Sequence, residues 1–252
     1  MSKPKVAFFD FTCCEGCQIE MTNYGDAAFL EFINHVDIVE FREAISETWD
    51  GGLDVAFVEG SVTDEHAAVR LQNIRARAKI LVALGSCATI GGVNGMKNAC
   101  DLAEVGRIVY GEARDLFPTA ATRALHQVVA VEYTIHGCPI SIPEFLTVLK
   151  CILAGIPYTV PDQAVCTECK RNENACLFDR GVTCLGPVTR AGCNSWCVNS
   201  GNICYGCRGL VSNPNEPGLV QVLSAHGISP EHIVKKIEMY NRCRAEDTGR
   251  GR

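Results

Sequence analysis

The chain has 252 residues, of which 47% are hydrophobic and 21% charged, and its formal net charge is −6. This length allows one large domain or two smaller ones with a real hydrophobic core. The acidic balance excludes the electrostatic footprint of a nucleic-acid-binding protein, and the sequence has no 18-residue apolar run that could span a bilayer.

The N-terminus leads directly from Met1 into the apolar run Val6–Phe9, without a signal peptide or a twin-arginine signal. We therefore expect a cytoplasmic protein. Its sixteen cysteines then need an explanation, because the cytoplasm keeps thiols reduced and structural disulfides are rare there. Metal or redox chemistry is favoured.

The first half alternates predicted strands with predicted helices. In chain order we expect a strand over 4–11, a helix from about residue 15, strands over 36–41 and 54–59, a helix over 64–78, a strand over 79–84, a helix over 112–126, a strand over 127–135 and a helix over 143–154. Continuously apolar strands in this alternation predict a parallel α/β sheet covered on both faces. Residues 91–95 read as a loop that lacks the lysine of a phosphate-binding loop.

Four cysteines follow predicted strands of this sheet. Cys14 and Cys17 form a C-x2-C pair after the first strand, Cys87 follows the fourth strand, and Cys138 follows the fifth. Because ligands of parallel sheets sit beyond the carboxyl ends of the strands, these thiols predict one four-cysteine metal site. Glycines that would allow backbone to approach inorganic sulfide stand beside them at Gly16, Gly85 and Gly137. The alternative is a thioredoxin-like pair at Cys14 and Cys17 with two core cysteines elsewhere.

The second half is rich in cysteine and glycine. A proline-bearing stretch over 156–163 predicts a boundary between a domain of residues 1–157 and one of residues 158–252. Eight cysteines follow within a short, weakly apolar segment: Cys166, Cys169, Cys176, Cys184, Cys193, Cys197, Cys204 and Cys207. Such a segment buries too little apolar surface to offset the entropy of ordering its backbone, so coordination must hold it. Eight thiolates suffice for two four-cysteine sites.

The remaining features have ordinary interpretations. Residues 213–217 read as a turn, and a helix is expected from Pro230 to about residue 244, with Tyr240 on its packing face. Four cysteines are expected not to be ligands. Cys100 and Cys151 are expected to be small buried hydrophobic residues, Cys13 breaks the C-x2-C spacing, and Cys243 lies near the end of the last predicted helix.

Iron–sulfur clusters explain the cysteines better than zinc does. The spacings x2, x6, x7, x8, x3, x6 and x2 do not repeat as zinc fingers do, and a third four-thiolate site on a parallel sheet is unusual for structural zinc. The sequence has neither a dinucleotide fingerprint nor a clear nucleophile–base pair. These features indicate a chain that carries electrons for a catalytic partner. A zinc-stabilised interaction module remains the alternative.

The motifs of the first half resemble the small subunit of nickel–iron hydrogenases: Cys14-Glu-Gly-Cys17, Glu59-Gly-Ser61, Gly85-Ser-Cys87 and Gly137-Cys-Pro139. Those of the second half are most similar to the delta subunit of the cytoplasmic, NADP-linked sulfhydrogenase type, with the methyl-viologen-reducing type close behind: Val165–Arg171, Cys184–Cys193 and Cys204–Cys207. The chain departs from many such subunits at Arg208-Gly-Leu210, where Phe-Gly-Pro is frequent.

The resemblance implies a flavodoxin-like domain followed by a small, loop-rich iron–sulfur domain, with three 4Fe–4S clusters. It assigns the proximal cluster to Cys14, Cys17, Cys87 and Cys138, the distal cluster to Cys166, Cys169, Cys176 and Cys184, and the medial cluster to Cys193, Cys197, Cys204 and Cys207. The division of the last eight rests on their order, and one pair could be exchanged. Cys197 stands where some relatives carry proline and hold a three-iron cluster, so a fourth iron is implied here.

The resemblance also implies partners. A large subunit would carry the nickel–iron centre, and a diaphorase or another iron–sulfur or flavin subunit would pass electrons to NAD(P) or another low-potential acceptor. The other class left open is an iron–sulfur subunit of a related respiratory complex that does no hydrogen chemistry, because such subunits share the N-terminal fold and use tandem cysteines such as Cys13-Cys14.

Overall fold

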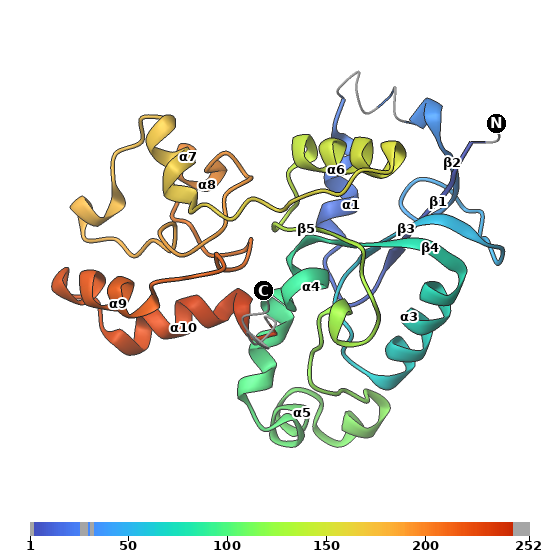
Figure 1. Cartoon of the computed structure of the whole chain (residues 1–252). Helices are drawn as coiled ribbons and strands as arrows, with labels where there is room; N and C mark the ends of the chain where they lie inside the picture. Colours follow the sequence, from blue (N-terminus) through green and yellow to red (C-terminus); the bar gives the residue numbers. More distant parts are fainter. Residues whose placement is uncertain (1–2, 26–29, 31–32, 244–252) are drawn as a thin grey trace.

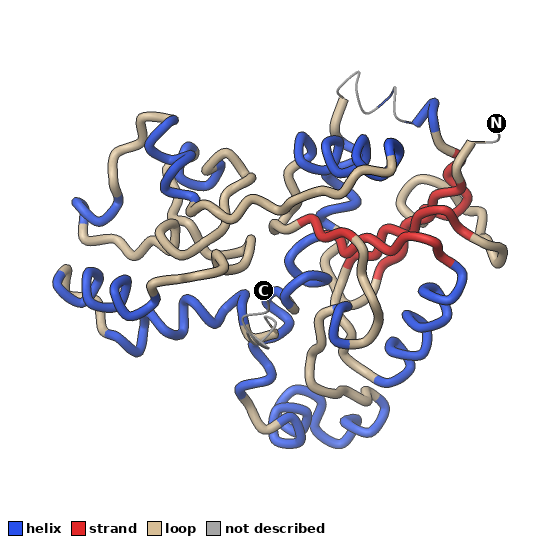
Figure 2. Tube along the Cα trace, viewed as in Figure 1, coloured by secondary structure: helices blue, strands red, loops and turns tan. Residues whose placement is uncertain are grey.

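The computed structural model describes residues 3–25, 30 and 33–243. Its first part is a five-stranded parallel sheet with the strand order β2-β1-β3-β4-β5, and its second part is loop-rich and carries the later cysteines (Figures 1 and 2). This strand order is that of flavodoxin-like folds. The predicted α/β class is therefore confirmed.

The elements follow the alternation that the apolar runs predict, with several additions. The sheet part contains β1 (Lys5–Asp10), α1 (Gly16–Asn23), β2 (Asp37–Phe41), β3 (Leu53–Glu59), α3 (Glu65–Arg77), β4 (Ala78–Leu84), α4 (Gly85–Ile90), η1 (Gly92–Ala99), α5 (Leu102–Tyr110), η2 (Gly111–Leu116), η3 (Leu125–Gln127), β5 (Tyr133–Ile135) and α6 (Ile142–Ala154), where η marks a 3-10 helix. The cysteine-rich part contains α7 (Val165–Arg171), η4 (Leu177–Arg180), α8 (Trp196–Asn199), α9 (Glu216–Ala225) and α10 (Pro230–Asn241).

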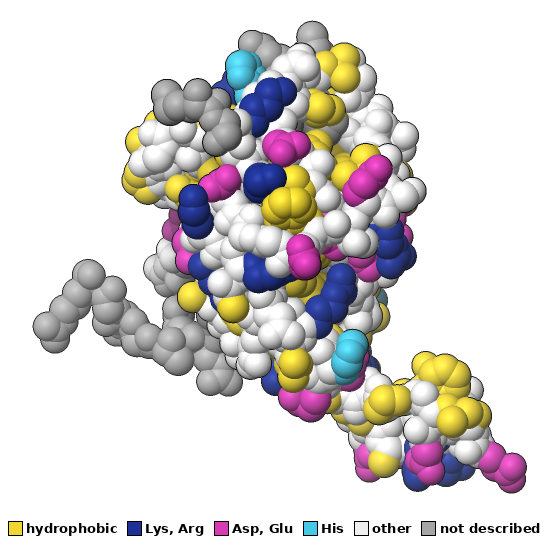
Figure 3. All heavy atoms as spheres, turned by 90° about the vertical axis from the view of Figure 1, so that its right-hand side faces the viewer, with side chains coloured by type: hydrophobic (Ala, Val, Ile, Leu, Met, Phe, Trp, Pro, Cys, Tyr) yellow, Lys and Arg dark blue, Asp and Glu magenta, His cyan; other side chains and the backbone are white. Residues whose placement is uncertain are grey.

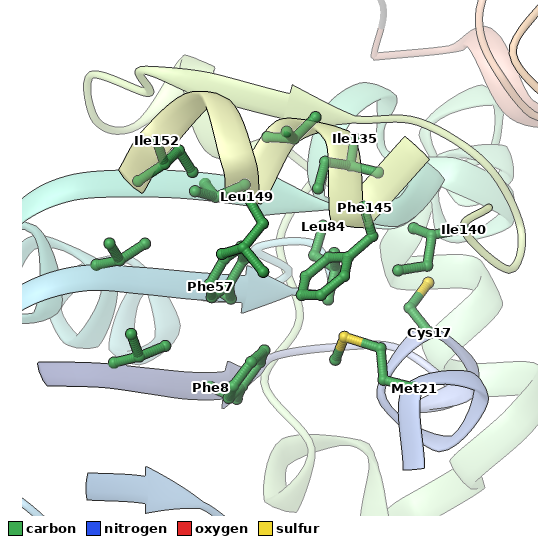
Figure 4. Close-up of a cluster of buried hydrophobic side chains, with 14 of the residues drawn as sticks. Phe8, Cys17, Met21, Phe57, Leu84, Ile135, Ile140, Phe145, Leu149 and Ile152 are labelled. Carbon is green, nitrogen blue, oxygen red and sulfur yellow. The ribbon is translucent and has the colours of Figure 1, made fainter. Parts of the chain in front are cut away.

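Helices cover both faces of the sheet, with α1 and α6 on one face and α3 on the other (Figure 1). On the first face Phe8 and Phe57 stack with ring centroids 4.9 Å apart, and Phe145 of α6 lies 5.3 Å from Phe57 (Figure 4). On the second face α3 buries Leu71 and Ile74. Burial of both faces holds the carboxyl ends of the strands in fixed positions, and the first cysteines follow those ends.

A separate small core stabilises the cysteine-rich part. Its buried members come from the cysteine loops and from α9 and α10: Leu185, Val188, Leu210, Leu219, Leu223, Ile233 and Ile237. The helix α10 also runs back to the sheet part, where it contacts η1 and α4 (Figure 1). The second part is therefore packed against the first.

Two predictions from the first half are wrong in their bounds. Residues 112–126 are not one helix, because Pro118 interrupts the segment and Arg123 pairs its backbone with Val62. The helix lies earlier, in α5, where the Asp101 side chain accepts hydrogen bonds from two backbone N–H groups at the helix start. Strand β5 is also shorter than the expected 127–135, because the valines before it pack onto the α3 face from a loop.

Two other segments are helical where a loop or turn is expected. Residues 91–95 lead into the 3-10 helix η1. Within the predicted turn over 213–217, the Asn215 side chain accepts a hydrogen bond from Gly218 N at 2.9 Å and caps α9. Pro217 occupies an early position of α9, where proline is tolerated because its missing N–H would have no helical partner.

The lobe formed by α5 and η2 projects from the sheet part and carries exposed apolar side chains (Figure 3). These are Ile108, Val109, Tyr110, Leu116 and Phe117. A hollow of about 590 Å³ separates the lobe from Thr12 and Thr63, which follow β1 and β3. Within the described residues, no helix is long and apolar enough to cross a membrane.

Candidate metal centres

The first group of cysteines lies at the carboxyl edge of the sheet, where three loops meet. The Ser86 N–H donates a hydrogen bond to the Gly137 carbonyl at 2.8 Å, which joins the loops after β4 and β5. Gly85 has φ +82°, and a Cβ there would lie 2.5 Å from the Cys17 Sγ. Only glycine therefore fits this contact between α1 and α4.

The predicted proximal thiols act on one another electrostatically, as expected for neighbours. Burial raises the pKa of Cys87 to about 12, and the charges of Cys138 and Cys14 add to this effect. The pKa of Cys17 is also raised, first by burial and with a smaller contribution from Cys138. The fold thus brings together four cysteines that come from three crossover turns. Cys13 lies in the same neighbourhood, since its charge also raises the pKa of Cys87.

A buried carboxylate, Glu59, supports this edge. Its oxygens accept hydrogen bonds from Cys17 N at 3.2 Å, Gln18 N at 3.1 Å and Gln18 Nε2 at 3.3 Å. Burial raises the pKa of Glu59, while the hydrogen bonds oppose the shift. Glu59 therefore anchors the first turn of α1, which carries Cys17.

The predicted distal thiols surround one enclosed cavity of about 50 Å³. Its wall contains all four of them, Cys166, Cys169, Cys176 and Cys184, together with apolar side chains. A Cβ at Gly186 would lie 3.3 Å from the Cys166 Sγ, so glycine leaves room for the sulfurs. Burial raises the pKa of Cys166 to about 11, and the charges of the other three cysteines add to the shift.

The predicted medial thiols lie between the other two groups. Burial raises the pKa of Cys207 to about 12, with contributions from the charges of Cys138, Cys193 and Cys197. At the other side, Cys204 N donates a hydrogen bond to the Cys184 Sγ at 3.5 Å. The three groups therefore follow one another in space, with Cys138 next to the medial group and Cys184 next to Cys204.

Several polar residues that fix these loops are not evident from the sequence. The Glu168 carboxylate accepts hydrogen bonds from Gly192 N at 2.7 Å and Ser195 N at 3.0 Å, which ties the helix α7 to the loop around Cys193. The Tyr240 hydroxyl, expected only to pack, is near Cys138 and lowers the pKa of that thiol against the larger effect of burial.

The other cysteines have different surroundings. Cys243 is buried, and its thiol donates a hydrogen bond to the Thr122 carbonyl at 3.1 Å. Cys151 is half-buried, whereas Cys100 is exposed, so the prediction of a buried Cys100 is wrong. All sixteen cysteines are within the described residues, and none forms a disulfide.

The donor set fits clusters held by thiolates. Among the residues that the structure describes, no three His, Cys, Asp or Glu side chains converge closely enough to hold a single metal ion. The distal thiols instead enclose a space several times the ~10–15 Å³ that one water needs, with an otherwise mostly apolar wall. A cluster bound by cysteine sulfurs in apolar surroundings matches that wall.

Comparison with known proteins places the sheet part, with the thiols at its carboxyl edge, in a family of oxidoreductase subunits. Residues 14–152 match the family of the NADH ubiquinone oxidoreductase 20 Kd subunit. The chain is 35% identical over 239 residues to the sulfhydrogenase 2 subunit delta of Pyrococcus furiosus, covering 94% of this chain and 99% of that one. It is 30% identical to a subunit of the F420-non-reducing hydrogenase vhu of Methanocaldococcus jannaschii, covering 96% of this chain and 95% of that one.

Solved structures of hydrogenases contain chains with a similar fold. A subunit of an NAD+-reducing [NiFe]-hydrogenase superposes with a TM-score of 0.56 at 25% identity, covering 64% of this chain and 96% of that one. A chain of the Ni-Fe-Se hydrogenase of Desulfomicrobium baculatum shares the fold, with a TM-score of 0.58 at 14% identity over 82% of this chain and 95% of that one. The chain belongs to the small subunits of the nickel–iron hydrogenases.

Proposed function

We propose that this small subunit carries electrons through three 4Fe–4S clusters, between a nickel–iron centre on its large-subunit partner and an acceptor subunit. The observation that carries the proposal is the succession of three groups of four thiols from the sheet edge into the cysteine-rich part. When bound, the clusters supply one-electron carriers of low potential. The chain's own residues set their positions and surroundings.

We keep the assignment of ligands that the family resemblance and the order of the cysteines imply. The proximal set is Cys14, Cys17, Cys87 and Cys138, the medial set is Cys193, Cys197, Cys204 and Cys207, and the distal set is Cys166, Cys169, Cys176 and Cys184. The common cavity of the distal thiols supports keeping those four together. The domain division at residues 157 and 158 belongs to the same proposal, because it separates the proximal set from the other eight cysteines.

The large subunit would dock at the carboxyl edge of the sheet. The exposed apolar lobe of α5 and η2 supports this placement, because it lies across a hollow from Thr12, two residues before Cys14. Electrons would leave the distal cluster for a diaphorase or another iron–sulfur or flavin subunit, which reduces NAD(P) or another low-potential acceptor. We place the complex in the cytoplasm, where sixteen cysteines stay reduced.

The alternative function is that of a respiratory subunit without hydrogen chemistry, since the matching family is that of the NADH ubiquinone oxidoreductase 20 Kd subunit. That match ends at residue 152, before the eight later cysteines. The matches to the hydrogenase relatives cover nearly the whole chain, and therefore extend beyond residue 152 into the part that holds these cysteines. Nickel in the purified complex would favour the hydrogenase, and a complex without nickel would favour the alternative.

Hydrogen-driven reduction tests the proposal directly. In the complex with the large subunit, purified without oxygen, hydrogen should bleach the brown absorbance of the clusters. Replacing a proximal ligand, Cys87→Ser, should prevent hydrogen from reducing the remaining clusters, because electrons enter at that end. A chemical reductant such as dithionite should still reduce them.

The matched control is Cys100→Ser, which changes an exposed cysteine outside the three groups and should behave as wild type. A colourless wild-type complex, or one that contains zinc in place of iron, would overturn the cluster assignment. Full hydrogen-driven bleaching in Cys87→Ser would overturn the order of the groups.

A further inference from the structure

The two parts of the chain are joined by a buried ion pair. The Arg208 guanidinium donates to both Glu144 oxygens, at 2.6 and 2.8 Å, and both side chains are at least 95% buried. It also donates to the His136 carbonyl at 2.7 Å and to the Ala191 carbonyl at 2.8 Å. The Tyr158 hydroxyl completes the network by donating to Glu144 Oε1 at 2.7 Å.

These bonds connect the segments that carry proposed ligands of two different clusters. Arg208 directly follows Cys207, His136 stands two residues before Cys138, and Ala191 stands two residues before Cys193. The contact is close, because a Cβ at Gly192 would lie 2.3 Å from Arg208 Nη2. One side chain therefore ties together the loops that deliver medial and proximal thiols.

The two charges of the network lie on different sides, with the cation near the proposed medial ligands and the anion in the sheet part. Arg208 directly follows Cys207, and the hydrogen bond from its Nε to the Ala191 carbonyl brings the guanidinium to the loop that leads to Cys193. The guanidinium thus acts on the medial side, whereas its counter-charge Glu144 sits on α6, in the sheet part. A cation next to a cluster stabilises the reduced form, which carries one more negative charge, and raises the reduction potential.

We propose that Arg208, held by Glu144, is a positioning residue that raises the reduction potential of the medial cluster and fixes this cluster against the proximal one. The inference rests on the proposed function, since it requires a medial cluster. It adds a tuning device built from two residues that are 64 positions apart and lie in the two parts of the chain.

The two charges should have opposite effects on the medial potential. In the complex with the large subunit, Glu144→Gln leaves the cation without its counter-charge, so the midpoint potential in an EPR-monitored redox titration should rise. Arg208→Gln removes the cation, so the potential should fall, whether or not Glu144 then takes up a proton. Both variants should melt at a lower temperature, because breaking one partner of a buried pair is strongly destabilising.

The conservative variant separates charge from shape. Arg208→Lys keeps the charge but cannot form the fork of four hydrogen bonds. Its medial potential should stay near wild type while its melting temperature falls, and the spin coupling between the proximal and medial clusters should change with their spacing. The matched control is Arg75→Gln, which removes a guanidinium bonded to Glu132 and to the carbonyls of Ala78 and Lys79, in a region with none of the cysteines.

Potential shifts of the same sign in Glu144→Gln and Arg208→Gln, or shifts no larger than in Arg75→Gln, would overturn the inference. Those results would leave the three clusters in place. A wild-type complex without any cluster signal would instead contradict the proposed function, so the two failures are distinguishable.

Discussion

At the scale of single residues, the sites depend on positions that carry no chemistry of their own. Gly85 begins α4 with φ +82°, and the Cys17 Sγ occupies the space where any Cβ would stand. The residue is needed twice, once for its backbone conformation and once for the approach of a sulfur atom. The effect of the sulfur contact can therefore be measured separately from the effect of the positive φ, by comparison with a glycine that has only the positive φ.

Gly85→Ala should remove the proximal cluster. The added Cβ would lie 2.5 Å from the Cys17 Sγ and would push that thiol out of place. We expect a loss of about four irons per chain, measured by metal analysis of the purified complex.

The control for this variant is Gly155→Ala. Gly155 also has a positive φ, +66°, but its Cβ would meet nothing within 4 Å. It should cost about 1 kcal/mol of unfolding free energy from backbone strain alone and keep all the iron. Equal iron in the two variants would show that the sulfur contact is unimportant.

The sequence identifies cysteines by their spacing but not the polar residues that hold their loops. Glu168 looks like an ordinary charged residue in a C-x2-C motif, and Arg208 like a departure from a family motif. Their partners lie 24 and 64 positions away along the chain, and no local pattern encodes such contacts. Sequence separation, rather than residue type, limits what can be predicted here.

At the scale of elements, apolar runs predict the buried strands well and the exposed helices poorly. The strands β1, β3 and β4 are buried on both faces, so their residues are continuously apolar and stand out. The helix α5 buries only Gly106 among its residues, and apolar side chains such as Ile108 and Val109 are exposed instead of packing into the core. The start of helix α9 is predicted as a turn, because the Asn and Pro residues there also favour turns.

The helices α9 and α10 should be needed for the cysteine-rich part to hold its clusters. Leu223→Ala removes a fully buried side chain from the small core there, so it should lower the unfolding free energy by about 2–5 kcal/mol. Heating the complex should then release medial and distal iron at a lower temperature than in the wild type. Cluster absorbance and circular dichroism measure this release.

The neighbouring residue provides the control. Val222 is 45% exposed on the same helix, and Val222→Ala should change the unfolding free energy by no more than about 0.5 kcal/mol. If both variants melted like wild type, the small core would not be what stabilises the cysteine-rich part.

At the scale of the whole molecule, the fold places cysteine motifs that are separate in the sequence next to one another in space. The sheet brings Cys14, Cys17, Cys87 and Cys138 to one edge, and α10 and the Arg208–Glu144 pair hold the second part against that edge. The parallel sheet and its sulfur-bearing edge follow from the alternation of apolar strands. The packing of the second part does not, because it depends on side chains from both halves of the chain.

If twelve cysteines hold three four-iron clusters, the iron and acid-labile sulfide content of the complex with the large subunit, purified without oxygen, reports this most directly. We predict about twelve irons and about twelve sulfides per chain, beyond the metal of the partner's own centre. About four of each, or zinc in place of iron, would contradict the account.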